Sequence, residues 1–302
     1  RIALSTKQNI HFILNPISGS GQNQLRLETI MSVFNNKNYN VTLKTSSHAT
    51  SLSSLAQLSI KEGADVVVAC GGDGTINEIA SPLVDTKIPL GIITLGSGNG
   101  LASHLEIPKK LLPALELIRD CHKIKIDVGV VNEHFFFSNM SVGVGAQVIN
   151  HYSKSKNRQL MSYLLATLKA LWPKTTLLKL KIEMEGLKKE ISPLVLFVSN
   201  SNEMGYKVSF TPKASLQDGK LDVVLTDQLS FFQKLIFAYQ IVFMKNKKFK
   251  KAKYFLTHQM RVTNKNGERF LIQIDGESKI ITSKVLDVSL QKAALNVIVP
   301  RI

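Results

Sequence analysis

One stretch near residue 70 joins a buried strand to a helix through a glycine turn, and it restricts the fold more than any other part of the chain. The β-branched run at 64–70 is typical of a strand buried in a parallel sheet. Gly71-Gly72-Asp73-Gly74-Thr75 follows it, and apolar residues then recur with a helical period up to residue 83. Glycines let the backbone approach a ligand closely, and a helix that begins at Thr75 presents unpaired N–H groups. This turn is therefore predicted to hold a phosphate group.

An acid stands in the middle of this turn, at Asp73. Its carboxylate would repel a bare phosphate. The acid therefore favours either a Mg²⁺ bridge to the phosphate or a proton-accepting role beside a phosphoryl group in transfer. A tight strand-to-helix connection without a ligand is the structural alternative.

The first 127 residues alternate between predicted strands and helices, which indicates a parallel sheet with right-handed crossovers. Ligands of such sheets bind at the carboxyl ends of the strands, where Gly19, the turn at Gly71 and the turn 96–99 are expected to lie. The predicted strands are 9–14, 41–45, 64–70, 90–94 and 123–128, and the predicted helices are about 22–35, 50–62, 75–83 and 108–119.

From about residue 128 the pattern changes to short strands separated by turns, which predicts an antiparallel β-rich domain over 128–293. Helices at 159–172 and 230–245 interrupt it. A last strand at 295–299 leaves open whether 294–302 returns to the first domain, residues 1–127. The other predicted strands are 130–142, 179–185, 191–199, 207–210, 221–226, 260–262, 270–274 and 285–290.

Several motifs resemble those of one enzyme family. The turn at 71–75 resembles the GGDGT signature shared by diacylglycerol kinases, sphingosine kinases, NAD kinases and, more distantly, 6-phosphofructokinases. Asn15-Pro16-Ile17-Ser18-Gly19 resembles the NPxSG segment of the lipid-kinase branch, and Gly96-Ser97-Gly98-Asn99 resembles its G-[ST]-x-N segment. Asp275-Gly276-Glu277 resembles its DGE tripeptide, and residues 212–222 resemble its P-x-A…DGxLD segment. The sequence is thus similar to the diacylglycerol kinase catalytic-domain family over about its whole length.

This resemblance implies a fold of α/β plus β class and an activity. The N-terminal domain would be a three-layer α/β domain with a parallel sheet, similar to NAD kinase and phosphofructokinase, and the C-terminal domain an antiparallel β-sandwich for the lipid. The implied enzyme is a lipid kinase that uses ATP and Mg²⁺ to phosphorylate a lipid hydroxyl. The sequence contains no G-x-x-x-x-G-K-[ST] motif, which excludes a P-loop kinase.

The family's functional residues carry over to both halves of this sequence. Glu277 would accept the proton of the lipid hydroxyl, while Asp73 would hold the catalytic Mg²⁺ or share the role of base. A structural Mg²⁺ site would use Ser215, Asp218 and Lys220, although Asp-Gly pairs such as 218–219 and 275–276 are also favoured hairpin turns. The implied ATP contacts are Asn15, Gly19, Thr45, Gly71, Gly72, Asp73, Gly74, Thr75, Ile76, Asn77, Ser97 and Asn99.

The sequence also bears on the acceptor. Sphingosine kinases carry an acid shortly after the glycine segment that matches 143–145, where this chain has Gln147, Ile149, Asn150 and His151. This departure favours diacylglycerol or another neutral lipid alcohol over an amine-bearing lipid. An NAD kinase-like enzyme with a soluble substrate and a nucleotide-binding module without catalysis are the alternatives.

Composition indicates anionic partners, because the net charge is +16 and the pI is near 9.7. The apolar helix at 230–245 leads into lysines 245–253, and the pair could dock on an anionic membrane, unless the helix is packed and its basic end solvated. No helix-turn-helix or RNA-binding aromatic strand is present, so no nucleic-acid partner is expected.

Cys70 and Cys121 are expected as buried, reduced thiols. With neither a signal-peptide core nor a membrane-length apolar run, the expected location is cytoplasmic and peripheral to the membrane, and a homodimer is compatible with the sequence.

Overall fold

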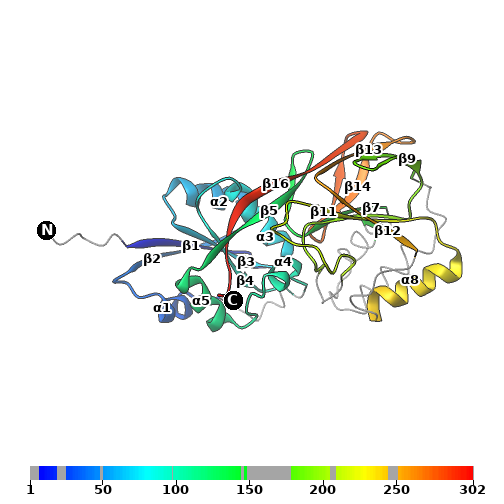
Figure 1. The fold of residues 1–302 in the computed structure, drawn as a ribbon. Helices are drawn as coiled ribbons and strands as arrows, with labels where there is room; N and C mark the ends of the chain where they lie inside the picture. Colours follow the sequence, from blue (N-terminus) through cyan, green and yellow to red (C-terminus); the bar gives the residue numbers. More distant parts are fainter. Residues whose placement is uncertain are drawn as a thin grey trace. The chain divides into compact units, whose positions relative to one another are not determined.

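The protein divides into two units, which contain the residues Arg1–Ile126 with Ala293–Ile302 and the residues Asp127–Lys292 (Figure 1). This computed structural model describes residues 7–18, 25–47, 50–96, 98–143, 146–147, 178–204, 209–243 and 251–301. The predicted helix at 159–172 lies outside the described residues.

The first unit is built on a parallel sheet with the strand order β2-β1-β3-β4. The end of β16 (Val285–Ile298) adds a further parallel strand beside β4, where Val297 pairs with Leu90. The strands are β1 (Gln8–Leu14), β2 (Tyr39–Thr45), β3 (Val66–Gly71) and β4 (Leu90–Thr94). The helices are α1 (Leu27–Val33), α2 (Leu52–Lys61), α3 (Asp73–Ala80), η1 (Ser81–Leu83), α4 (Gly100–His104) and α5 (Leu111–Asp120).

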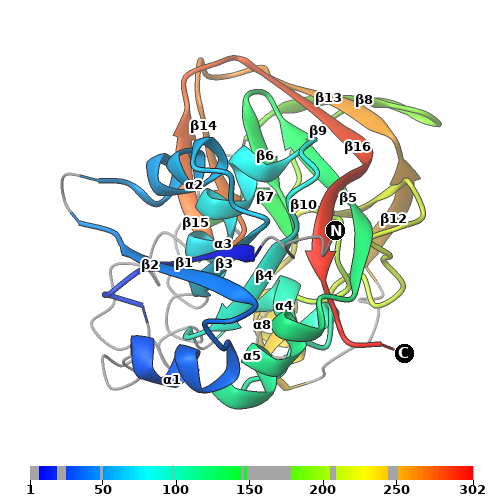
Figure 2. The same ribbon diagram turned by 90° about the vertical axis from the view of Figure 1, so that its left-hand side faces the viewer.

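Helices cover both faces of this sheet. Figure 2 shows α2 and α3 on one face and α1 and α5 on the other. Alternate strand residues such as Phe12 and Val68 pack against Ile30 of α1 and Leu115 of α5 in a buried core. Because the strands are buried on both faces, β3 is apolar throughout. The predicted three-layer α/β domain is confirmed.

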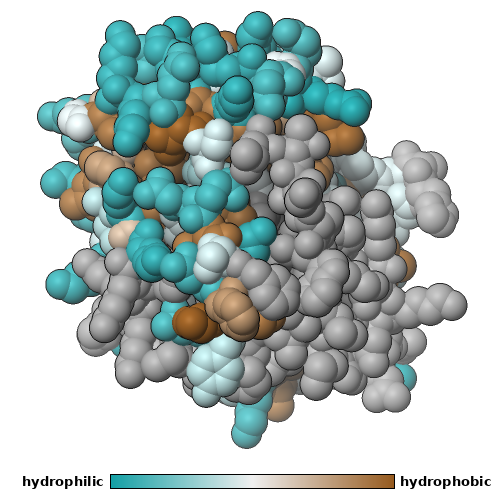
Figure 3. Space-filling view, turned by 90° about the vertical axis from the view of Figure 1, so that its right-hand side faces the viewer, coloured by the Kyte–Doolittle hydropathy of each residue, from teal (hydrophilic) through white to brown (hydrophobic). Residues whose placement is uncertain are grey.

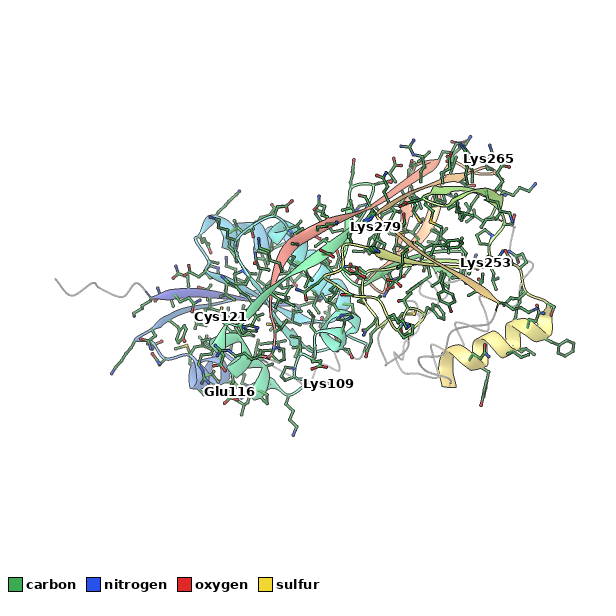
Figure 4. All side chains as sticks on the ribbon, in the orientation of Figure 1. Lys109, Glu116, Cys121, Lys253, Lys265 and Lys279 are labelled. Atoms are coloured by element: carbon green, nitrogen blue, oxygen red, sulfur yellow. The ribbon has the colours of Figure 1, made fainter. Side chains whose placement is uncertain are left out.

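Of the two cysteines, Cys70 belongs to this core and Cys121 packs against it. Cys70 on β3 is fully buried, whereas Cys121 (Figure 4) is only half-buried after α5, so the prediction of two buried thiols is correct for Cys70 alone. Burial raises the pKa of both thiols, so both are expected to be weakly nucleophilic.

His11 on β1 is a buried titratable group that predicts a pH dependence of stability. Burial, followed by the positive charge of Lys44, lowers its pKa, although Glu62 lies 3.6 Å from its Nδ1. Below about pH 6.5 an unfolded histidine binds a proton that folded His11 does not bind, so stability should fall as the pH falls through this range. The loss stops once the pH reaches the lowered pKa of the folded state. In His11→Gln, the loss between about pH 7.5 and about pH 5.5 should be smaller in urea unfolding curves; an unchanged loss would contradict this assignment.

The second unit is an antiparallel sandwich. One sheet has the order β12-β11-β10-β7-β14-β15, and in the other β16 pairs with β13, β13 with β8, and β8 with β9. The strands are β5 (Lys123–Val131), β6 (His134–Phe136), β7 (Asn139–Gly143), β8 (Leu180–Met184), β9 (Leu187–Ile191), β10 (Val195–Ser199), β11 (Leu221–Thr226), β12 (Ala252–Thr257), β13 (Gln259–Asn264), β14 (Phe270–Ile274) and β15 (Glu277–Ile281). Helix α8 (Phe231–Phe243) lies between β11 and β12 in the sequence.

A single apolar core joins the two sheets of the sandwich. Met140 and Leu196 of the first sheet pack with Ile182 and Val262 of the second, and all four are buried. The predicted β-sandwich is therefore confirmed.

Some predicted strands differ from those observed. The predicted strand at 130–142 is divided, because a turn at Asn132, with a φ of +50°, separates β5 from β6. Residues 209 and 210 do not form the predicted strand. The predicted strands at 285–290 and 295–299 are parts of the single strand β16. Strands β9, β12 and β15 were not predicted, and β9 and β15 alternate too little between apolar and polar residues to be recognised from their sequences.

Candidate functional site

The turn after β1 and the turn after β3 are joined at Thr75. Asn15 Nδ2 donates to Thr75 Oγ1 over 3.0 Å, and Ser18 Oγ lies 3.2 Å from the same oxygen. The backbone N–H of Asn15 also donates to the carbonyl oxygen of Cys70 over 3.2 Å. Thr75 itself is buried, so this hydroxyl fixes the two turns relative to each other.

The turn after β4 lies against the turn after β3. A Cβ atom on Gly96 would lie only 2.8 Å from the Cα atom of Gly72, and one on Gly71 would lie 2.5 Å from the side chain of Thr75. The N–H of Leu95 donates to the carbonyl oxygen of Gly71 over 3.0 Å. Glycine is therefore required at 96 because the backbone of Gly72 approaches closely, and at 71 because the side chain of Thr75 does.

Asn99 presents an acceptor beside these turns. It is buried in the left-handed region, with a φ of +54°, and its Nδ2 donates to the carbonyl oxygen of Gly96 over 2.6 Å. Its Oδ1 is buried and has no hydrogen-bond partner within the described part of the chain. A Cβ on Gly96 would lie 3.1 Å from this oxygen. Because buried acceptors are normally satisfied, Oδ1 is suited to a donor on a ligand.

Asp73 is the first residue of α3, two residues earlier than the predicted helix start at Thr75, and its side chain is half-buried. The N-cap is Gly72, so no side chain caps the first turn, and Ile76 N donates to the carbonyl oxygen of Gly72 over 2.9 Å. The first N–H groups of this helix therefore point out of its N-terminus together with its partial positive charge.

The remaining predicted ATP contacts fall into three groups. Thr45 ends β2 at the same edge of the sheet and is exposed, while Gly74 and Asn77 are half-buried on α3. Ile76 is buried, so only its backbone could contact a ligand. Gly19 and Ser97 lie outside the described residues. In the first unit the structure thus brings together Asn15, Gly71, Gly72, Thr75 and Asn99.

In the second unit, Asp275 and Gly276 form the two-residue turn between β14 and β15. Both have positive φ, at +45° and +84°, as the favoured hairpin turn requires. Glu277, the first residue of β15, is exposed at the end of this turn. The Asp-Gly pair thus forms the hairpin turn that such pairs favour, and exposed Glu277 follows it.

The side chain of Asp275 holds this hairpin in place. It is only 4% exposed, and its carboxylate accepts hydrogen bonds from the N–H groups of Phe137 (2.8 Å), Ser138 (2.8 Å) and Asn139 (3.0 Å). The N–H of Asp275 donates in return to the carbonyl oxygen of Asn139 over 2.9 Å. A carboxylate that accepts three backbone hydrogen bonds fixes the position of the turn that precedes Glu277.

The predicted structural Mg²⁺ residues lie on one loop before β11. Ser215 Oγ accepts from the N–H of Gln217 over 3.2 Å, and Asp218 Oδ1 accepts from the N–H of Lys220 over 3.0 Å. The structure adds a residue that the sequence analysis did not name: buried Asp127 accepts from the N–H of Gly219 through Oδ2 over 2.7 Å. Its only sequence signal is a lone acid within the apolar strand β5.

The described residues contain no group of three or more His, Cys, Asp or Glu side chains that could hold a metal ion. Any metal at the loop before β11 would need hydroxyl, carbonyl or water oxygens in addition to the carboxylates. In the same part of the chain, no helix is both long and apolar enough to cross a membrane.

Comparisons with known proteins agree with this architecture. Staphylococcus aureus strains bovine RF122 / ET3-1 and JH9 have curated proteins named diacylglycerol kinase that are 25% and 24% identical to this chain over 226 residues, or 74% of this chain and 71% of each relative. The match to one solved structure, from Bacillus anthracis strain Sterne, covers 99% of this chain and 98% of the other chain, with a TM-score of 0.77 and 20% sequence identity. Another from that strain, of a diacylglycerol kinase, has a TM-score of 0.69 at 17% identity and covers 97% of each chain.

Two family descriptions match consecutive parts of the sequence. Residues 9–131 match the diacylglycerol kinase catalytic domain, and residues 138–299 match the YegS C-terminal NAD kinase beta sandwich-like domain. The second match alone covers more than half of the chain, and the solved structures share the fold. The chain therefore belongs to the family of proteins that join a diacylglycerol kinase catalytic domain to a YegS C-terminal NAD kinase beta sandwich-like domain.

Proposed function

We propose that this chain is an ATP-dependent lipid kinase that transfers the γ-phosphate to a lipid hydroxyl, with diacylglycerol or a related neutral lipid alcohol as acceptor. Family membership and the relatives named diacylglycerol kinase support a lipid kinase in general. The observation that carries the proposal is the junction of the turns after β1 and β3 at Thr75, with the turn after β4 packed against Gly72 and Asp73 opening α3.

In this proposal the first unit binds ATP. Backbone N–H groups of the turn after β3 and of the first turn of α3 would hold the phosphates, because they are donors at a helix N-terminus. Asn99 Oδ1 would accept a hydrogen bond from the nucleotide, which would satisfy this buried oxygen. Thr45 and Asn77 would contact ATP from the same edge of the sheet.

Mg²⁺ prefers oxygen ligands, and Asp73 and Asp218 carry carboxylate oxygens of this kind. Asp73 would hold the catalytic ion, while Asp218 with Ser215 and a carbonyl oxygen at Lys220 would hold a structural ion, joined by the neighbouring Asp127. When bound, Mg²⁺ neutralises charge on the phosphate oxygens. The protein would contribute the ligand oxygens, from Asp73 at the start of α3 and from Asp218 in the loop before β11.

The proposed reaction places a carboxylate beside the acceptor hydroxyl. The lipid oxygen forms a bond to the γ-phosphorus, the bond from this phosphorus to the bridging β,γ-oxygen breaks, and ADP leaves with that electron pair. Glu277, exposed at the hairpin, accepts the hydroxyl proton late in the step, and Asp73 remains the alternative base.

The direct test compares acceptors with the wild-type protein. ADP formation would be measured with diacylglycerol dispersed in detergent and with NAD as separate acceptors. Turnover should require the lipid. Turnover with NAD alone would instead support a soluble-substrate kinase, and no turnover with any lipid alcohol would favour a nucleotide-binding module without catalysis.

The proposal also includes docking on an anionic membrane through α8. Its exposed apolar residues recur at helical spacing on one face: Phe232 (75% exposed), Leu235 (39%), Ile236 (53%) and Tyr239 (56%). Figure 3 shows apolar side chains at the surface on this side of the second unit. Of the basic run, Lys251 precedes β12 and Lys253 lies on it, where Lys253 pairs with Asp227 over 3.4 Å (Figure 4). An apolar face beside a basic run is typical of helices that lie in a membrane interface.

Replacing Phe232 and Ile236 by serine should weaken binding to anionic vesicles by about 100-fold or more. Burial of each of these apolar side chains in the bilayer would otherwise contribute roughly 1.5–3 kcal/mol to the free energy of binding. Vesicle co-sedimentation measures this, and neutralising the basic run should reduce binding further. Leu58→Ser with Leu112→Ser, two exposed leucines of the first unit, is the matched control. Equal binding by both double variants would remove the docking proposal.

The proposal also includes a location in the cytoplasm, peripheral to the membrane, because a protein there would meet both ATP and the lipid. A homodimer remains a prediction, and sedimentation velocity over a range of protein concentrations tests it.

A further inference from the structure

Glu203 lies in a loop after β10 that encloses Ser138. The Ser138 and Ser201 hydroxyl oxygens lie 2.7 Å apart, and each lies 2.9 Å from the carbonyl oxygen of Glu203. The N–H of Ser201 donates to the carbonyl oxygen of Ser138 over 3.0 Å. These contacts fix the backbone of Glu203 to Ser138.

The same Ser138 also fixes the hairpin of Glu277. Its N–H donates to Asp275 Oδ1 over 2.8 Å, and Asp275 lies two residues before Glu277. Two hydrogen bonds through one residue therefore connect the Glu203 loop to the hairpin that would present the proposed base. All of these residues belong to the second unit, so the connection is internal to it.

Two buried oxygen atoms of this loop lack donors. Neither Glu203 Oε2 nor Asn200 Oδ1 has a hydrogen-bond partner among the residues that the structure describes. The amide of Asn200 is fully buried, and its orientation is fixed because Nδ2 donates to the carbonyl oxygens of Asp127 (2.8 Å) and Phe137 (3.1 Å). Leaving buried acceptors unsatisfied is costly, so a donor from outside these residues is expected here.

We propose that Glu203 accepts a hydrogen bond from a second donor on the head group of the acceptor lipid, a hydroxyl or an amine close to the hydroxyl that is phosphorylated. Diacylglycerol offers no such second donor, since its other two oxygens are esterified. This inference rests on the proposed lipid kinase function, and it favours a related lipid with two donors on the head group over diacylglycerol as the acceptor.

The test measures kcat/KM with three lipids of equal chain length: diacylglycerol, monoacylglycerol and a long-chain 2-amino-1,3-diol. The wild-type protein should prefer one of the two lipids that have a second donor. This preference is the kcat/KM for that lipid divided by the kcat/KM for diacylglycerol. Glu203→Ala should lower this ratio by about 10–100-fold, because the variant lacks the acceptor for the second donor. Glu268→Ala, an exposed acid that pairs with Lys284 over 3.4 Å, should leave this ratio unchanged.

Glu203→Gln distinguishes the two sources of the donor. Glutamine keeps a carbonyl oxygen but no negative charge, so it should retain much of the preference for a hydroxyl and lose that for an amine. It also keeps the test decisive if Glu203→Ala fails to fold, because it has nearly the same shape.

The outcomes separate this inference from the function on which it rests. Failure of the wild-type protein to phosphorylate any of the lipids would overturn both. A wild-type preference for diacylglycerol, or a ratio that neither variant changes, would overturn the role of Glu203 and leave the lipid kinase proposal standing. An equal fall for all three lipids would do the same, since it would indicate a merely structural role.

Discussion

Replacing Asp73 by asparagine is expected to lower kcat for lipid phosphorylation by about 10²–10⁴-fold while the protein stays folded. Asparagine has the same shape but lacks the negative charge, so it could neither accept a proton nor hold Mg²⁺ strongly. The side chain is half-buried at the first position of α3, and asparagine and aspartate have similar helix propensities, so the helix should persist. The measurement is kcat at saturating ATP and lipid, with thermal unfolding as the test of folding.

Asp120→Asn, at the exposed end of α5 in the same unit, is the matched control and should keep normal turnover. Near-normal turnover in folded Asp73→Asn would refute the catalytic role of Asp73. The companion variant Glu277→Gln should lower kcat more than it weakens ATP binding. A pure loss of ATP affinity in Glu277→Gln would contradict its assignment as the base.

Replacing Asp275 by alanine is expected to reduce the free energy of unfolding of the protein by roughly 3–5 kcal/mol, the range for breaking a buried charged hydrogen-bond network. The substitution leaves the N–H groups of Phe137, Ser138 and Asn139 buried without their acceptor. Urea unfolding measures the change. The transition that reports the second unit should shift most, because all four residues belong to it.

Asp287→Ala provides the control for this prediction. Asp287 is exposed and pairs with Arg261, with 2.6 Å between Oδ1 and Nε, and exposed pairs of this kind contribute about 0–1 kcal/mol. A loss of less than about 1 kcal/mol in Asp275→Ala would show that the hairpin does not depend on this carboxylate. Asp275→Asn should fall between the two, because one side-chain oxygen remains to accept.

Sequence patterns predicted the two-domain fold where local signals and tertiary structure agree. The β-branched run that forms β3 is buried on both faces, so its composition identifies it, and the Asp275-Gly276 pair has the chemistry of the hairpin that it forms. The exposed edge strands β9 and β15 were missed because their side chains are mostly polar and solvated. Strand β16 was predicted as two pieces, because the polar residues Gln291 and Lys292 interrupt its apolar pattern.

The candidate site could be predicted only in part, for a physical reason. Glycine turns are local, so 71–75 and 96–99 are recognisable in the sequence. The contacts that give Asp127, Ser138 and Glu203 their places are not local: Asp127 bonds to Gly219, 92 residues away, and Ser138 bonds to Asp275, 137 residues away. The roles of the predicted ATP and metal residues remain predictions that the variants above test.

The account depends on transfer of phosphate from ATP to a lipid alcohol, and the fate of a radiolabel at the γ-position measures this directly. With the wild-type protein and anionic vesicles that contain the lipid alcohols, the label should enter the lipid fraction in step with ADP formation, and Asp73→Asn should greatly reduce both. Formation of ADP with all of the label left as inorganic phosphate, or equal labelling of lipid by the two proteins, would contradict the account.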